Sequence, residues 1–198
     1  MELEPHDFFK GGVIGLRKKL LALCLTAVML TATGCDEVAS EQSEPTVAAQ
    51  QARAFEKFPS FTSKALDGST VTENIFVGKK LTVVNIWGTF CPPCIAEMPE
   101  LGRWAAEMPE DVQLIGLVCD VRSENDEPAI NAAKKILSES NANFINIIPS
   151  AGLIDYLSTV EAVPTTIFVD GDGKIVGAPI IGADVDAYKN FVDAYVNN

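Results

Sequence analysis

Two cysteines separated by two prolines, Cys91 and Cys94, follow the end of an apolar run. Two thiols at this spacing on the first turn of a helix can close a disulfide. A helix N-terminus stabilises a nearby thiolate, which is the nucleophile in thiol–disulfide exchange. We therefore predict that Cys91 is an exposed nucleophile and that Cys94, inside the helix, is a buried resolving thiol. Pro92 and Pro93 suit a first turn, where backbone N–H groups lack helical partners.

Other uses of a cysteine pair fit the sequence less well. A structural zinc site takes four Cys or His ligands, but the one histidine, His6, is remote and no second pair of closely spaced cysteines is present. A structural disulfide across two residues closes so short a loop that it stabilises little. No His follows Cys94 to make a haem-attachment motif. We expect redox chemistry at this pair, with no metal and no cofactor.

Apolar, β-branched runs predict the strands that position the pair, and helical stretches alternate with them. Strands followed by helices indicate an α/β fold, and the turn 170–173 before the last strand indicates a closing hairpin and hence a mixed central sheet flanked by helices. The predicted strands are 81–87, 112–118, 144–148, 165–169 and 174–177, and the predicted helices are 93–108, 126–140, 153–157 and 183–196.

From about Phe58 to its end the chain resembles the TlpA/ResA-like, extracytoplasmic branch of the thioredoxin superfamily. The matching segments are 85–87, the cysteine pair with 94–101, and 163–174. The resemblance implies a thioredoxin-like fold with an inserted strand and helix before Pro164. It also implies a thiol–disulfide oxidoreductase that needs no cofactor.

The same resemblance implies that Pro164 is a cis proline that faces the cysteine pair. The backbone of Val163 would then be free to pair with a substrate segment, and Trp87, Pro92 and Pro93 would belong to the same substrate-binding region. From the residues alone, a cis proline is uncommon, and an ordinary trans proline at a strand start stays the alternative.

Glu97 lies three positions after Cys94, so a helix would place both on one face, toward the sheet. Plain thioredoxins carry a buried Asp two residues before the Trp, whereas this chain has Asn85, which cannot take a proton. The resemblance implies that Glu97 is the substitute acid and accepts the proton of Cys94, with a pKa raised by burial. The alternative is a solvated carboxylate such as Glu107. Cys119 is expected to be a small buried hydrophobe.

The N-terminal segment predicts export. The basic residues 17–19 precede an apolar run of about 14 residues, which is shorter than the roughly 20 of a membrane-spanning helix. We predict a lipoprotein-type signal peptide over 1–34, with acylation of Cys35, a flexible tether over 35–57 and a thioredoxin-like domain over 58–198. Ala32 stands where lipoprotein signals usually carry Leu, so ordinary signal peptidase, which would cut the same bond, stays an alternative.

The charge limits the partners. The chain carries 27 acidic and 15 basic residues, a formal net charge of −12, which disfavours nucleic acid and anionic lipid surfaces as partners. We predict a protein anchored by lipid to the outer face of the cytoplasmic membrane. Its expected partners are a membrane thiol electron donor and oxidised protein thiols, such as those of apocytochrome c or a methionine sulfoxide reductase.

The direction of electron flow follows from the residues between the cysteines. Two prolines add no charge and remove two N–H donors, which favours a reductase over an oxidant. A peroxiredoxin-type peroxidase is an alternative, but it needs a Pro seven residues before Cys91, where Val84 stands. A non-enzymatic copper metallochaperone is a second alternative, which would need a His beside the pair.

Overall fold

A mixed five-stranded sheet lies at the centre of the structure, a computed structural model that describes residues 56–197. The strand order is β5-β4-β3-β6-β7. β3, β4 and β5 are parallel, whereas β6 runs antiparallel to β3, and β7 antiparallel to β6. The strands span Leu81–Trp87 (β3), Val112–Val118 (β4), Asn146–Ile147 (β5), Thr165–Asp170 (β6) and Ile175–Ile181 (β7).

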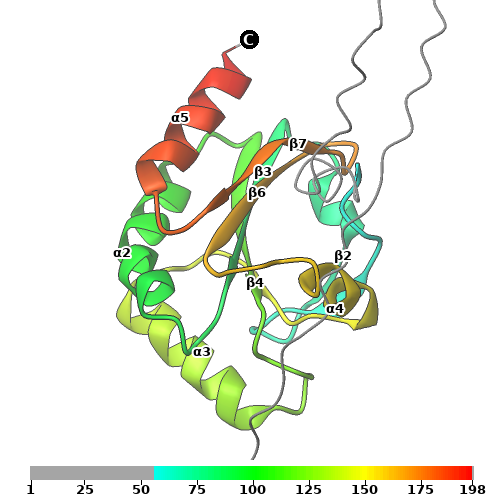
Figure 1. Cartoon of the computed structure of the whole chain (residues 1–198), viewed down its shortest axis with the longest axis vertical. Coiled ribbons are helices and arrows are strands. Elements are labelled where there is room, and N and C mark those ends of the chain that lie inside the picture. Colours follow the sequence, from blue (N-terminus) through cyan, green and yellow to red (C-terminus); the bar gives the residue numbers. More distant parts are fainter. Residues whose placement is uncertain (1–55, 198) are drawn as a thin grey trace, which may run out of the picture. The chain divides into compact units, whose positions relative to one another are not determined.

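Helices cover both faces of the sheet. The helices α2, α3 and α5 lie on one side, and α4 lies on the other with a small antiparallel pair, β1 and β2 (Figure 1). The helices span Pro92–Glu107 (α2), Glu127–Glu139 (α3), Ala151–Leu157 (α4) and Val185–Val196 (α5), and the N-terminal elements are Thr62–Lys64 (β1), Thr70–Thr72 (β2) and the 3-10 helix Glu73–Phe76. The predicted α/β, thioredoxin-like architecture is therefore confirmed, and the segment between β4 and the cis proline contains α3, β5 and α4.

The central strand β3 explains where the site lies. All seven of its residues are buried, and successive side chains point to opposite faces. Val83 and Trp87 pack into the core under α2, and Val84 and Ile86 pack into the other core. Asn85 therefore faces α2, as the one polar side chain on that face of β3.

The observed elements differ from the predicted ones at the sheet edges and before β3. β5 has two residues instead of five. β7 continues to Ile181, through Pro179, and a proline is tolerated there because β7 is an edge strand of the sheet. The β1–β2 pair and the 3-10 helix were not predicted, since their runs are only three or four residues long.

The predicted signal peptide, Cys35 and nearly all of the predicted tether lie outside the described residues. Glu56 and Lys57, which we placed at the end of the tether, pair with the start of β7: Ile175 N–H donates to Glu56 O at 2.9 Å, and Lys57 bridges to Lys174. Over residues 56–197, the helices are too short or too polar to cross a bilayer.

Candidate active site

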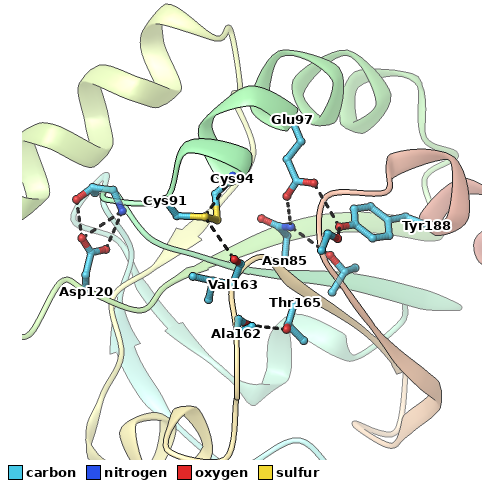
Figure 2. Close-up of a disulfide and its surroundings, with 12 residues drawn as sticks. Asn85, Cys91, Cys94, Glu97, Asp120, Ala162, Val163, Thr165 and Tyr188 are labelled. Carbon is cyan, nitrogen blue, oxygen red and sulfur yellow. Dashed lines mark hydrogen bonds between the residues drawn. A yellow bond between two sulfur atoms is a disulfide. The ribbon is translucent and has the colours of Figure 1, made fainter.

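A disulfide joins Cys91 and Cys94 where β3 gives way to α2 (Figure 2). Their Cα atoms lie 5.3 Å apart, which is within the usual range for a disulfide. Cys91 is the N-cap of α2, with extended backbone, and Cys94 lies within the first turn. The sequence prediction of a cysteine pair at a strand–helix junction is therefore confirmed.

The two prolines decide which N–H groups face Cys91. Pro92 and Pro93 occupy the first helical positions and carry no N–H. The first N–H of the helix is therefore that of Cys94, and it donates to Cys91 Sγ at 3.3 Å. A negative charge on Cys91 would be stabilised by this N–H and by the helix dipole.

Both sulfurs are poorly accessible in the disulfide form. Cys91 is 4% exposed and Cys94 0%. The prediction of an exposed Cys91 was therefore wrong for this form, because Cys91 packs against the Val163 carbonyl oxygen, 3.5 Å from its sulfur. Pro92 and Pro93 are exposed beside the disulfide.

The loop opposite the disulfide contains a cis peptide bond between Val163 and Pro164, as the resemblance implied. Thr165 Oγ1 donates to Ala162 O at 2.7 Å and ties the two ends of the loop together (Figure 2). Val163 is half-buried and Pro164 is buried. The loop therefore presents the Val163 carbonyl to Cys91, while Pro164 is buried.

Glu97 points from α2 toward the sheet and is 6% exposed. Its Oε1 accepts from Asn85 Nδ2 at 2.9 Å, and its Oε2 lies 3.3 Å from the Tyr188 hydroxyl (Figure 2). Asn85 Nδ2 also donates to Thr166 Oγ1 at 3.1 Å, and Thr166 is the cross-strand neighbour of Asn85. The alternative of a solvated Glu97 is excluded, whereas Glu107 is exposed.

Burial raises the pKa of Glu97 from 4.5 to about 7, in the predicted direction. Hydrogen bonds from Asn85 and Tyr188 oppose the shift, because they favour the charged form, and the nearby charge of Glu100 adds to it. Both protonation states of Glu97 are therefore populated near neutral pH. No hydrogen bond within residues 56–197 joins this carboxyl to either sulfur, so a proton from Cys94 would need a bridging water or a closer approach.

Trp87 does not reach the surface. It is 0% exposed, and its Nε1 donates to Asn146 Oδ1 at 2.8 Å. The Asn146 side chain occupies the place that a Cβ on Gly116 would take. The structure therefore places Trp87 in the same buried core cluster as Cys91 and Cys94, rather than on the face where a substrate would lie.

Asp120 holds the loop that leads to Cys91. It accepts from Thr89 N at 3.0 Å and from Thr89 Oγ1 at 2.5 Å (Figure 2). The next side chain, Phe90, is 67% exposed. Cys119 was expected to be buried but is only half-buried, and it packs against the core on the α4 side of the sheet. Burial, with a smaller contribution from the charge of Asp120, raises the pKa of Cys119 to about 11.

The sequence reasoning missed Tyr188, Asn146, Asp120 and Phe90. Tyr188 and Asn146 come from segments far from the pair, and no local spacing connects them to it. An exposed aromatic next to Cys91 was a local signal that could have been used for Phe90.

Residues 56–197 contain no group of three or more His, Cys, Asp or Glu side chains that could hold a metal ion.

Comparisons with known proteins agree with this geometry. The model of a family described as Redoxin matches residues 53–181. The thiol-disulfide oxidoreductase ResA of Bacillus thuringiensis is 31% identical over 119 residues, which are 60% of this chain and 64% of ResA. The ResA protein of Halalkalibacterium halodurans is 27% identical over 143 residues, which are 72% of this chain and 77% of that protein. The chain thus spans slightly less than two thirds of the first of these relatives.

A solved structure is similar over the same region. A secreted disulfide oxidoreductase of Mycobacterium tuberculosis, homologous to DsbE of E. coli, has a TM-score of 0.53 and 29% sequence identity. The match covers 68% of this chain and 95% of that one. The match therefore covers nearly the whole of a protein that is described as a disulfide oxidoreductase.

Proposed function

The chain belongs to the Redoxin family, and from this premise we propose that it is a thiol–disulfide oxidoreductase that reduces protein disulfides through Cys91 and Cys94. One observation carries the proposal. The disulfide lies at the N-terminus of α2, and the Val163 carbonyl of the cis-proline loop lies 3.5 Å from Cys91 Sγ. A substrate sulfur that approached Cys91 would meet both a stabilised thiolate and the backbone of that loop.

In the first step of the reaction, the Cys91 thiolate attacks one sulfur of the substrate disulfide. A mixed disulfide forms, and the other substrate sulfur leaves as a thiolate that takes a proton from water. Cys94 then loses its proton, attacks the Cys91 sulfur and releases the second substrate thiolate. Two electrons have passed to the substrate, and the enzyme is left with the Cys91–Cys94 disulfide.

Glu97 is the proton acceptor in the second step. Its pKa of about 7 suits a group that must take a proton and give it up again near neutral pH. The proton of Cys94 passes to Glu97 and then to the second substrate thiolate, so the protons balance. Asn85 supports the carboxylate by its hydrogen bond and takes no proton itself.

The reducing direction is supported by Pro92 and Pro93, which leave the Cys94 N–H as the first helical donor toward Cys91. An oxidant requires an unusually stable reduced form, and fewer donors to the thiolate disfavour it. The electron donor is a membrane thiol carrier. The substrates are oxidised protein cysteines outside the cytoplasm, of the kind found in apocytochrome c or a methionine sulfoxide reductase.

Trapping of the mixed disulfide tests the proposal. Cys94→Ala removes the resolving thiol, so the variant should accumulate in disulfide-linked complexes that dithiothreitol releases and that mass spectrometry maps to Cys91. The variant Cys91→Ala is the matched control and should trap nothing. Equal trapping by the two variants, or none by either, would contradict the assignment.

Export and anchoring form a separate part of the proposal: residues 1–34 are removed, Cys35 is acylated, and residues 35–57 link the lipid to the domain. The similar Mycobacterium tuberculosis oxidoreductase is described as secreted, which supports export. Mass spectrometry of the N-terminal peptide, with Cys35→Ser as the control, tests the lipid. An unmodified Cys35 at the mature N-terminus would favour the ordinary signal peptidase instead.

A further inference from the structure

The Tyr188 hydroxyl lies at a junction of four polar groups, although the residue is 0% exposed. It donates to Gly182 O at 2.6 Å and lies 3.3 Å from Glu97 Oε2. The Asp184 N–H donates to it at 3.3 Å, and the Thr166 hydroxyl is a further hydrogen-bond partner. Tyr188 thus connects the acid of α2 to the segment between β7 and α5.

A phenol has one hydrogen, so this hydroxyl can donate to only one of its two acceptors at a time. While Glu97 is neutral, it does not require a donor from Tyr188, so Tyr188 can donate to Gly182 O. Once Glu97 is ionised, it needs a donor, and a hydrogen bond to a carboxylate is stronger than one to a neutral carbonyl. The ionised acid therefore competes with Gly182 for the same hydrogen.

Gly182 connects this competition to the cis-proline loop. Its N–H donates to Pro164 O at 2.8 Å, while its carbonyl accepts from Tyr188. On the other side of the loop, Val163 O lies 3.5 Å from Cys91 Sγ. Glu97 and the loop are therefore linked through Tyr188 and a single glycine residue.

The other charged and polar groups around Glu97 leave Tyr188 as the hydrogen-bond donor to its Oε2 atom. From α2, Glu100 raises the pKa of Glu97, and Glu100 is itself paired with Lys189 of α5 at 2.6 Å. From β3, Asn85 donates to Oε1 rather than to Oε2. Burial raises the pKa of Tyr188, so its hydroxyl keeps its hydrogen while Glu97, with a pKa of about 7, titrates.

We propose that Tyr188 is a positioning residue that transmits the protonation state of Glu97 to the cis-proline loop: its hydroxyl holds the Gly182 carbonyl while Glu97 is neutral, and turns to Glu97 when Glu97 is ionised. The cis-proline loop is then more mobile while Glu97 is ionised and ready to accept a proton. It is less mobile after Glu97 has taken one. The consequence for turnover rests on the proposed role of Glu97 as acceptor, whereas the coupling itself rests on the contacts alone.

The test is an NMR titration of the oxidised full chain, without substrate, from about pH 5 to about pH 9. The Glu97 carboxyl carbon and the Gly182 carbonyl carbon should titrate with one shared midpoint. In Tyr188→Phe the Glu97 signal should still titrate and the Gly182 response should be lost. Tyr195→Phe, the same change elsewhere on α5, should keep both responses.

A second variant keeps the test decisive if Tyr188→Phe does not fold. Glu97→Gln cannot ionise, so the Gly182 response should vanish while Tyr188 is still present. Exchange of the Gly182 amide hydrogen should be faster in the wild type than in Glu97→Gln above the midpoint, and equal below it. A Gly182 response that is absent in the wild type, or that persists in Glu97→Gln, would overturn the coupling.

The titration also separates this inference from the proposed function. Since no substrate is present, the coupling can be observed even if the protein proves not to be a reductase. If the coupling is found but Glu97→Gln reduces disulfides as fast as the wild type, the acceptor role of Glu97 fails and the coupling stands.

Discussion

Asn85 of β3 donates a 2.9 Å hydrogen bond to Glu97 of α2, and both side chains are buried. Asn85 cannot take a proton, so the titratable group of this pair lies on the helix and not on the strand. Asn85 favours the ionised form of Glu97, and burial favours the neutral form. Their balance sets the pKa of Glu97 near neutrality.

Replacement of Glu97 by Gln should slow disulfide reduction by roughly ten- to a thousandfold, since the proton acceptor is removed. The amide can keep the contacts with Asn85 and Tyr188, so the fold should survive. The rate against pH should also lose the ionisation near pH 7 that the wild type shows. Glu107→Gln, an exposed position on the same helix, is the control. Wild-type rates and an unchanged pH profile for Glu97→Gln would rule out the acceptor role.

The stability of the oxidised protein should depend on Glu97 in a defined pH window. Because the folded state raises the pKa of Glu97 from 4.5 to about 7, it binds this proton more tightly than the unfolded chain does. The contribution is complete below about pH 4.5 and is lost as the pH rises to about 7. As the pH rises from about 4.5 to about 7, the free energy of unfolding of the wild type should therefore fall relative to that of Glu97→Gln. The expected fall is on the order of 3 kcal/mol.

Urea titrations of both proteins at several pH values measure this difference. Glu107→Gln should follow the wild type at every pH, because its carboxylate is exposed. A constant difference between the wild type and Glu97→Gln across the window would mean that Glu97 has the same proton affinity in both states.

Alkylation of the reduced protein near pH 7 should label Cys91 much faster than Cys94 or Cys119. Cys94 lies inside the first turn of α2 and Cys91 at its N-cap. Burial raises the pKa of Cys119 to about 11, so little of the Cys119 thiolate is present. The Cys91 thiolate is stabilised at the N-terminus of α2. Peptide mapping after brief exposure to iodoacetamide gives the three rates, and faster labelling of Cys94 would reverse the assignment.

The reduction potential of the pair should lie below about −200 mV, on the reducing side of the disulfide isomerases. The reason is that Pro92 and Pro93 supply neither charge nor N–H to the Cys91 thiolate. Equilibration with glutathione or dithiothreitol buffers gives the value. Changing Pro93 to His adds a cationic group beside the thiolate and should raise the potential. A wild-type value near that of the strong oxidants, about −120 mV, would contradict the reductase direction.

The sequence by itself determined the cysteine pair, its position between a buried strand and a helix, and the alternation of strands and helices. These features rest on local spacing and hydrophobic pattern, which a chain carries whatever its neighbours are. The same spacing placed Glu97 on the face of α2 that holds Cys94. A resemblance in motifs, rather than any local rule, indicated the cis peptide bond before Pro164.

Only the tertiary structure decided what surrounds Glu97 and the disulfide. Tyr188 reaches Glu97 from 91 residues away, and Asn146 reaches Trp87 from 59 residues away, through packing that no local pattern encodes. The burial that raises the pKa of Glu97 likewise needs α5 and the sheet to close over it. The accessibility of Cys91 was predicted wrongly for the same reason, because it depends on the Val163 carbonyl that a distant loop brings to within 3.5 Å of the sulfur.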